Sequence, residues 1–259
     1  METARSKDGT SIAYDRSGEG PPVVIVGGAL QHRAAEAPLA ALLAAEFTVF
    51  AYDHRGRGDS GDTPPYAVDR EVEDLDAIIA AAGGSACVYG SSSGANLAIV
   101  AAAQGLGIAK LAVHEPNYLV DASRPPLPGN YVEHLNQLLP EGRRGDAVAY
   151  FLTTAVGLPA EFVAPMRDLP VWQAMEAAAP TLPYDGAVVE GFALPTNRLA
   201  AVSVPTLVIA GEASAAWLRA GAQAAADALP NARCRTLEGQ DHNVAAEAVA
   251  AVLREFFAG

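Results

Sequence analysis

The predicted fold depends most on the stretch Val88-Tyr89-Gly90-Ser91-Ser92-Ser93-Gly94-Ala95-Asn96. An apolar, β-favouring run ends at residue 89, and a helix-favouring run starts at residue 95. The residues between them read G-x-S-x-G and must make a tight strand-to-helix turn, for which glycine at both ends leaves room. Such a turn strains its central residue and lifts the Ser92 hydroxyl toward a substrate. We interpret the stretch as a nucleophile elbow.

The surroundings of this motif matter, because glycine- and serine-rich turns between a strand and a helix are common. A Gly-x-Asp-His segment at 239–242 lies far downstream, so the serine precedes a histidine in the chain. With these features the chain resembles the α/β-hydrolase superfamily over nearly its whole length. The resemblance implies an α/β fold: a doubly wound, mostly parallel sheet with a helical cap inserted after strand six.

The order of the expected elements agrees with this architecture. Strands are expected at 11–16, 23–26, 47–52, 86–89, 110–113, 205–211 and 234–237, and helices at 34–46, 68–82, 95–104, 216–229 and 244–257. From residue 117 to 203 the alternation stops, and prolines separate short helical pieces. We predict a core domain of residues 1–116 and 204–259 and a helical cap of residues 117–203. The cap should roof the active site, because ligands bind at the carboxyl ends of such strands.

Composition excludes several classes of function. The chain has 259 residues, enough for one large core, and a formal net charge of -13 from 30 acidic and 17 basic residues. This charge repels nucleic acid and anionic membrane surfaces. No signal-peptide core and no apolar run of the ~20 residues that span a bilayer is present. We expect a cytoplasmic protein with a small-molecule substrate and without a nucleic-acid or membrane partner; a homodimer stays open.

Cysteine and histidine usage gives no sign of a metal site. Cys87 and Cys234 each fall in an expected strand, and we predict two buried thiols rather than a disulfide. The five histidines are scattered, without CxxC or HExxH spacing. We therefore predict no metal and no cofactor.

The loop Gly27-Gly28-Ala29-Leu30 follows the expected strand at 23–26. In the superfamily this loop supplies one oxyanion-hole N–H, and the residue after the nucleophile supplies the other. By position, the resemblance implies Ala29 and Ser93 as donors and places Gly28 against the substrate. The usual His-Gly of the loop is Gly27-Gly28 here, which removes a side chain but keeps the backbone donor. An ordinary glycine turn is the alternative interpretation.

A second segment, Asp53-His54-Arg55-Gly56-Arg57-Gly58-Asp59-Ser60, resembles the D-x-R-G-x-G-x-S segment of the superfamily. Its role there is mostly structural. We therefore assign Asp53, His54 and Arg55 to loop architecture rather than to chemistry.

A serine hydroxyl needs an adjacent base at neutral pH, and that base needs a third group to orient it. His242 is the only histidine after the last expected strand, where the superfamily places its base. The acid usually follows strand seven in a G-x-x-D segment, but the corresponding residues are Gly211-Glu212-Ala213-Ser214. Glu212 comes too early in this segment. Glu115, at the end of strand six beside the elbow, is the acid that we predict.

Some α/β-hydrolases place their acid at the end of strand six, and the zearalenone-type lactone hydrolases are such a group. The chain resembles them in its elbow, in His114-Glu115 and in a cap tryptophan, Trp172. The resemblance implies that Trp172 faces the substrate and donates its indole N–H to a substrate oxygen. Packing inside the cap is the other interpretation of Trp172.

These residues predict a serine hydrolase that cleaves an ester or lactone of a hydrophobic small molecule through an acyl-enzyme on Ser92. A C–C bond hydrolase or a thioesterase with the same triad stays open. A further alternative is a degenerate fold that serves as a scaffold or binding protein, because strand seven lacks its acid.

Overall fold

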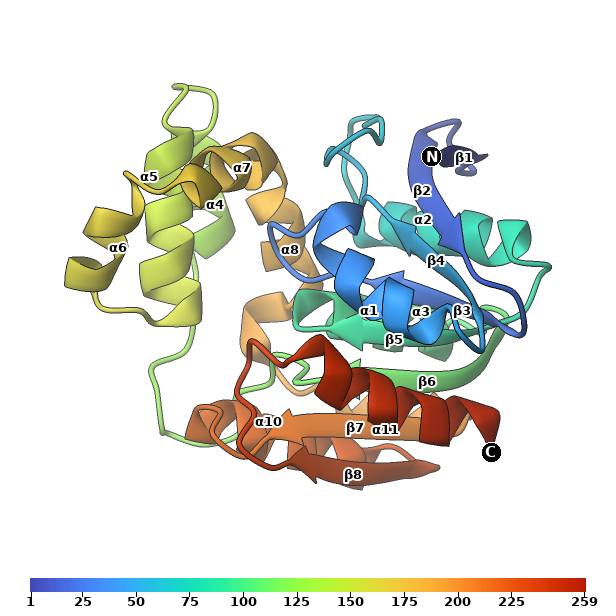
Figure 1. The fold of residues 1–259 in the computed structure, drawn as a ribbon. Coiled ribbons are helices and arrows are strands. Elements are labelled where there is room, and N and C mark those ends of the chain that lie inside the picture. Colours follow the sequence, from blue (N-terminus) through green and yellow to red (C-terminus); the bar gives the residue numbers. More distant parts are fainter.

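One eight-stranded sheet runs through the molecule in the order β1-β2-β4-β3-β5-β6-β7-β8 (Figure 1). The computed structural model describes residues 1–259. The strands from β4 across to β8 pair in parallel, and β1 and β2 form an antiparallel edge. The strands are β1 (Glu2–Arg5), β2 (Ser11–Ser17), β3 (Pro22–Val26), β4 (Thr48–Tyr52), β5 (Ala86–Ser91), β6 (Ile108–His114), β7 (Thr206–Gly211) and β8 (Ala232–Leu237).

Both faces of this sheet are covered, as the uniformly apolar central strands require. Successive residues of β3 point to opposite faces, so Val24 and Val26 pack in one cluster and Val23 and Ile25 in the other. On the first face lie α2 (Val68–Ala81), α3 (Ser93–Ala103) and α10 (Ala216–Ala228). On the second lie α1 (Ala37–Leu43) and α11 (Ala246–Ala258). The predicted doubly wound α/β fold is confirmed.

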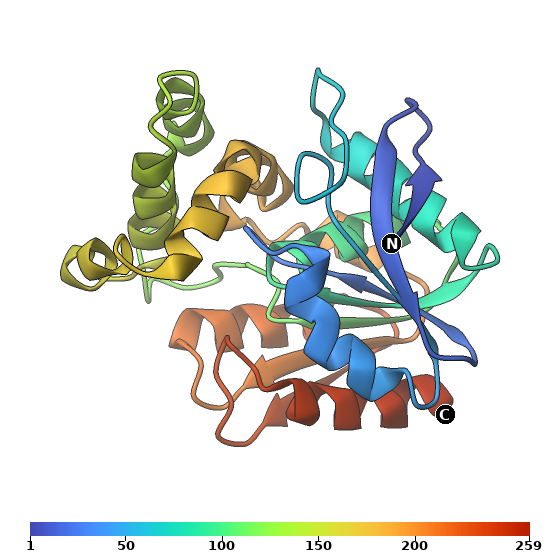
Figure 2. The same ribbon diagram turned by 45° about the horizontal axis from the view of Figure 1, so that its top comes forward.

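Between β6 and β7 the chain forms a group of short helices, here called the inserted helices (Figures 1 and 2). A proline lies in the first turn of α7 and of α8. Its missing N–H breaks no helical hydrogen bond at this position, and its fixed φ favours the start of a helix. The inserted helices are α4 (Tyr131–Leu138), α5 (Arg144–Tyr150), η2 (Phe151–Val156), α6 (Ala160–Met166), α7 (Pro170–Ala178), η3 (Ala179–Thr181), α8 (Leu182–Val188), η4 (Glu190–Phe192) and α9 (Thr196–Ala200).

The inserted helices have an apolar cluster of their own, which includes Leu135, Trp172 and Leu182. Trp217 and Leu218 of α10 complete this cluster, so the helices are packed onto the sheet domain. Both ribbon views show α4 to α7 gathered to one side of the sheet. The division of the chain into a core of residues 1–116 and 204–259 and a cap of residues 117–203 stays a prediction.

Three local expectations need correction. The helix expected at 34–46 is a 3₁₀ turn, η1 (Arg33–Glu36), followed by the shorter α1, because Pro38 in the first turn sets where α1 starts. The short strand β1 was not expected. Both thiols are free, but only Cys87 is buried; Cys234 is half-buried because β8 is an edge strand.

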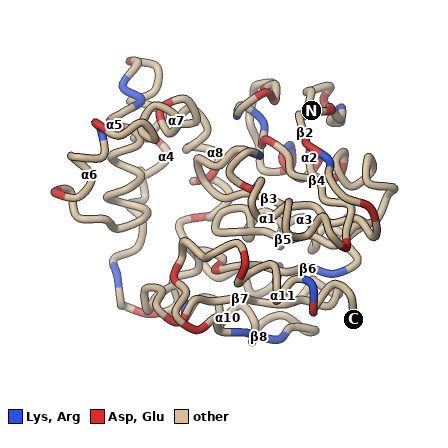
Figure 3. Tube along the Cα trace, viewed as in Figure 1, with Lys and Arg blue, Asp and Glu red and all other residues tan.

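Charged residues are distributed over the whole trace, and the Lys and Arg positions do not gather on one face (Figure 3). No group of three or more His, Cys, Asp or Glu side chains is placed to hold a metal ion. None of the helices is both long and apolar enough to cross a bilayer.

Candidate active site

The turn between β5 and α3 is as sharp as the G-x-S-x-G pattern predicts. Ser92 has φ 55° and ψ -123°, a left-handed conformation that is strained for a residue with a side chain. A Cβ on Gly90 would lie 2.6 Å from the carbonyl oxygen of Gly94, and a Cβ on Gly94 would collide with the carbonyl of Gly27. Both glycines are therefore needed for the backbone to pass so closely.

Three of the predicted site residues form one chain of hydrogen bonds, here called the relay. His242 Nε2 lies 3.2 Å from Ser92 Oγ, and His242 Nδ1 lies 2.6 Å from Glu115 Oε2. An ionised carboxylate can only accept hydrogen bonds, so Nδ1 carries the proton and Nε2 is left to accept from the serine hydroxyl. The structure thus brings Ser92, His242 and Glu115 together in the order that proton transfer from the serine requires.

The register of the sheet places Glu115 in the relay. Ser91 of β5 pairs with His114 of β6, so the residues that follow these two partners, Ser92 and Glu115, leave the sheet side by side. The Ser92 N–H donates to the His114 carbonyl oxygen at 2.9 Å. Glu115 has φ 47°, which turns its side chain away from the strand direction.

Glu115 is buried yet ionised. Burial acts to raise its pKa, but the hydrogen bonds from His242 and from the Gly211 N–H, at 2.8 Å, outweigh burial and hold the pKa of Glu115 below its usual value. Glu212 lies elsewhere: it is exposed and accepts a hydrogen bond from the Gly239 N–H at 3.0 Å. Glu115, and not Glu212, therefore contacts the histidine.

His114 is a neighbour of the relay whose side chain makes no hydrogen bond. Its ring is fully buried, and neither ring nitrogen has a partner. Its ring stacks on that of His242, with centroids 5.9 Å apart. Burial lowers the pKa of His114 to about 4, so the ring is neutral at pH 7 and adds no charge beside His242.

The loop after β3 approaches the nucleophile closely. A Cβ on Gly28 would lie 3.1 Å from Ser92 Cβ, so the Gly28 backbone lies against the serine. Ala29 follows in the loop, and no hydrogen bond within the protein uses its N–H. Ser93 is buried at the first position of α3. The structure thus places Gly28 against Ser92, with Ala29 next in the loop, and Ser93 directly after Ser92 at the start of α3.

Trp172 lies in the apolar cluster of the inserted helices, with only 3% of its surface exposed. Its Nε1 donates to Glu176 Oε1 at 2.9 Å, one turn further along α7, and the Arg167 guanidinium lies over its ring. The indole N–H is therefore occupied by Glu176 in this structure, and a contact with a substrate oxygen stays a prediction. Packing within the inserted helices is the role that the contacts show.

Sequence reasoning missed Asn117, Arg57 and Asp185. Asn117 Oδ1 lies 3.4 Å from Ser92 Oγ, at the start of the chain that leaves β6. Arg57 and Asp185 form a buried ion pair close to the loop after β3. The Asp53–Ser60 motif pointed to the loop that holds Arg57, but no sequence signal links Arg57 to an aspartate 128 positions away.

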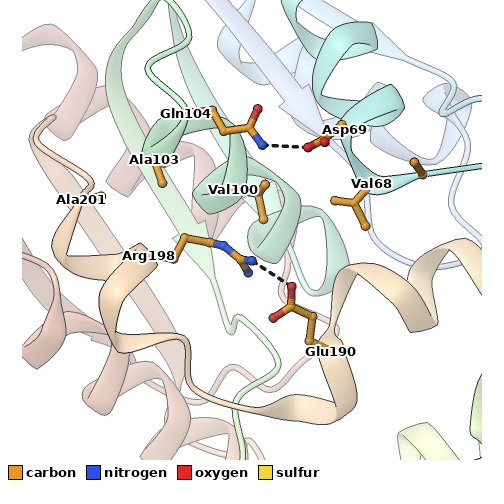
Figure 4. A pocket seen from close by; sticks show the side chains of 9 residues that line it. Val68, Asp69, Val100, Ala103, Gln104, Glu190, Arg198 and Ala201 are labelled. Atoms are coloured by element: carbon orange, nitrogen blue, oxygen red, sulfur yellow. Dashed lines mark hydrogen bonds and ion pairs between the residues drawn. The ribbon is translucent and has the colours of Figure 1, made fainter.

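Two surface hollows lie away from the relay. One, of about 470 Å³, lies between α2, α3 and α9 and is crossed by an ion pair between Arg198 and Glu190 and a hydrogen bond between Gln104 and Asp69 (Figure 4). The other, of about 680 Å³, is lined by residues 119–126. Neither is lined by Ser92, so hydrogen bonds and not cavity size define the candidate site.

Comparison with known proteins agrees with this fold. The model of the alpha/beta hydrolase family matches residues 23–255. A search among curated proteins found no match. An alpha/beta hydrolase from Sphaerobacter thermophilus DSM 20745 is 61% identical, with a TM-score of 0.95 over 99% of this chain and 100% of that one.

More distant solved structures share the fold. A hydrolase from Pseudomonas aeruginosa PA01 is 22% identical, with a TM-score of 0.78 over 100% of this chain and 98% of that one. The enol-lactonase from Burkholderia xenovorans LB400 is 23% identical, with a TM-score of 0.74 over the full length of both chains. From the family match and the 61% identical relative, the chain is a hydrolase that belongs to the alpha/beta hydrolase family.

Proposed function

We propose that the protein hydrolyses an ester or lactone of a hydrophobic small molecule through an acyl-enzyme on Ser92. One observation carries the proposal: the relay from Ser92 Oγ through His242 to Glu115, with separations of 3.2 and 2.6 Å. These separations suit the transfer of a proton from serine to histidine. The mechanism uses only side chains and backbone groups of the protein and water.

In the first half-reaction, Ser92 Oγ attacks the substrate carbonyl carbon while His242 Nε2 takes the hydroxyl proton. The Ala29 and Ser93 N–H groups bind the oxygen that becomes negative, and each is expected to lower the barrier by ~3 kcal/mol. Glu115 stabilises the imidazolium through Nδ1. When the tetrahedral intermediate collapses, His242 gives its proton to the departing alkoxide.

In the second half-reaction, His242 takes a proton from water, and the resulting hydroxide attacks the acyl carbon. The same two N–H groups bind the second oxyanion. Collapse then returns the proton to Ser92 Oγ and releases the acid. For a lactone, acid and alcohol leave as one molecule, since a ring bond is the one cleaved.

Residue types narrow the reaction class. Serine at the elbow favours acyl transfer over the alkyl-enzyme chemistry of members of this fold that carry aspartate there. A thioesterase or a C–C bond hydrolase would use the same relay, so only the substrate separates these from an esterase. Glu115 takes the place of the acid that strand seven lacks, which argues against a degenerate scaffold.

The inserted helices are proposed as a cap over the site. Asp185 of α8 accepts a hydrogen bond from the Ser93 hydroxyl at 2.8 Å, so α8 lies directly beside the elbow. The largely apolar sequence between β6 and β7 is the reason for proposing a hydrophobic substrate.

The test is hydrolysis of a panel of linear esters, thioesters and lactones, together with labelling by a fluorophosphonate probe. Labelling located by mass spectrometry at Ser92, with turnover of at least one ester or lactone, is expected. Intact folded protein that neither turns over the panel nor takes up the label would overturn the proposal. Faster cleavage of linear esters than of every lactone would remove the lactone part alone.

A further inference from the structure

Arg57 is a buried cation outside the relay, and each of its three side-chain nitrogens donates at least one hydrogen bond. Nη1 donates to the carbonyl oxygens of Gly28 at 2.8 Å and Gln31 at 3.3 Å. Nε donates to Thr181 Oγ1 at 2.8 Å, and Nη2 to Asp185 Oδ2 at 2.5 Å. A buried charge is costly unless it is paired and hydrogen-bonded, so this geometry is strongly specified. Arg57 thereby joins the loop after β3 to the inserted helices.

The bond from Arg57 to Gly28 bears on the proposed oxyanion hole. A peptide unit is planar and trans, so the Gly28 C=O and the Ala29 N–H point in opposite directions within one plane. Holding the C=O on Arg57 therefore fixes the direction of the Ala29 N–H. The Gly28 backbone lies against Ser92, so that direction is set beside the nucleophile. A cation on the carbonyl oxygen also polarises the amide and strengthens its N–H as a donor.

The preceding carbonyl is held in a similar way. His54 Nε2 lies 3.0 Å from the Gly27 carbonyl oxygen, and His54 Nδ1 lies 2.6 Å from Glu71 Oε2. The Glu71 carboxylate is buried, and so is the His54 ring that it holds. Two consecutive carbonyls of the loop are thus anchored by side chains of the 53–60 segment, and neither carbonyl is free to rotate away.

Asp185 extends this anchoring to the second proposed donor. Its Oδ2 accepts from Arg57, and its Oδ1 accepts from the Ser93 hydroxyl at 2.8 Å. Ser93 is the residue whose N–H is the second oxyanion donor in the proposed mechanism. One carboxylate on α8 therefore links both sides of the hole.

We propose that Arg57 and Asp185 are positioning residues that set the relative placement of the Ala29 and Ser93 N–H groups. Because Asp185 belongs to α8, the tetrahedral intermediate is fully stabilised only when α8 is packed against the elbow. The proposal rests on the acyl-transfer function proposed above. Neither side chain touches the reacting atoms, and both act through the loop and the elbow.

The test uses Arg57→Lys and Asp185→Asn in the full chain. Lysine keeps the charge but loses the planar fork that reaches several acceptors at once. An oxyanion hole acts on the transition state and not on the bound ester, so kcat should fall about 10- to 100-fold while KM changes little. The pH dependence of kcat should keep its midpoint, because the relay is untouched.

A second readout reports on the hole directly. Ser92 Oγ adds to the carbonyl carbon of an aryl trifluoromethyl ketone, its proton passes to His242, and the ketone oxygen becomes an oxyanion in the hole. The affinity for this ketone should fall by the same factor as kcat in each variant. Substrate affinity, measured in the Ser92→Ala background, should not change.

Arg55→Lys is the matched control. Arg55 is a buried arginine of the same segment, paired with Asp74 at 2.7 Å and Asp8 at 3.0 Å, and it makes no hydrogen bond to the loop after β3. The Arg55→Lys variant should have a melting temperature as low as that of Arg57→Lys, while its kcat and its affinity for the ketone stay at the wild-type values. Loss of stability alone is thereby separated from loss of positioning.

Ser93→Ala is a milder variant in case Arg57→Lys or Asp185→Asn does not fold. It keeps the N–H donor and removes only the bond to Asp185, so a smaller fall in kcat with constant KM is expected. Wild-type kcat and ketone affinity in folded variants, or a rise in KM alone, would overturn the positioning role. Wild-type protein that fails to label at Ser92 would instead overturn the proposed function.

Discussion

The two sides of Ser92 are built differently. On the relay side, Glu115 and His242 come from the end of β6 and the loop after β8, both parts of the sheet domain. On the side of the proposed oxyanion hole, here called the oxyanion side, the loop after β3 and the start of α3 are tied through Arg57 to Asp185 of the inserted helices. The residues of the relay make their hydrogen bonds within the sheet domain alone. The hydrogen bonds of the oxyanion side also include the inserted helices, so the proposed positioning role predicts that displacing those helices weakens this side and not the relay.

The largest expected effect comes from removing the reacting oxygen of the relay, Ser92 Oγ. Ser92→Ala should lower kcat on the order of 10⁶-fold, because His242 and the oxyanion donors are left with no nucleophile to assist. Steady-state hydrolysis of an activated ester measures the loss. Ser85→Ala, an exposed serine before β5, is the matched control and should behave as wild type. Comparable rates in the two variants would rule out Ser92 as nucleophile.

Glu115→Gln should come next, with kcat lower by roughly 10⁴-fold, because a neutral amide no longer orients the histidine or stabilises its imidazolium. Glu212→Gln changes an exposed carboxylate that has no contact with His242 and should leave kcat unchanged. Folding of both variants is checked by circular dichroism. If Glu115→Gln keeps its activity while Ser92→Ala is inactive, another group completes the relay.

Gly28→Ala tests the oxyanion side by steric means. The new methyl group would lie 3.1 Å from Ser92 Cβ and 3.2 Å from the Ser91 carbonyl oxygen, so the loop must shift by a few tenths of an ångström. A shift of this size at an oxyanion donor should lower kcat about tenfold at constant KM. Gly129→Ala, where a Cβ meets nothing within 4 Å, is the control. Equal kinetics for the two alanine variants would show that the loop tolerates displacement.

The remaining expected effect concerns stability rather than rate. The pKa of His114 falls from 6.5 to about 4 on folding, so the unfolded chain binds a proton first as pH falls. Stability should therefore be lost between pH 6.5 and 4, with a contribution on the order of 3 kcal/mol fully lost below pH 4. Urea unfolding at pH 7 and pH 5 measures this change.

His114→Phe keeps a buried ring but cannot titrate. Its unfolding free energy should fall less between pH 7 and pH 5 than that of wild type. Glu115 does not produce the same signal in this range, because its pKa lies below 4.5 in the folded state and its contribution is present above that pH. An identical pH dependence for His114→Phe and wild type would assign the acid sensitivity to other groups.

Short patterns in the chain were sufficient to predict the sharp turn at Ser92 and the approach of His242 to it. The G-x-S-x-G turn is dictated by contacts within a few residues, such as the approach of Gly90 to Gly94. Alternating and uniform apolar runs predicted the doubly wound sheet, since the period of side chains along a strand is fixed by its backbone. Glu115 could be chosen over Glu212 because a strand end beside the elbow has a predictable position in such a sheet.

Other features had no local signal. The indole of Trp172 meets Glu176 on its own helix, yet which face of α7 would be buried depended on how the inserted helices pack. The end of α1, the short β1 and the half-buried Cys234 follow from edges and neighbours that a single segment does not contain.

The amino-acid order alone determines most of the strands and helices and the sharp turn at Ser92, because backbone geometry and side-chain period act over short distances. The joining of Arg57 to Asp185 across 128 positions arises only when the inserted helices fold back onto the sheet. Because both charges are buried, each must be paired, and this long-range electrostatic constraint ties the loop after β3 to the inserted helices.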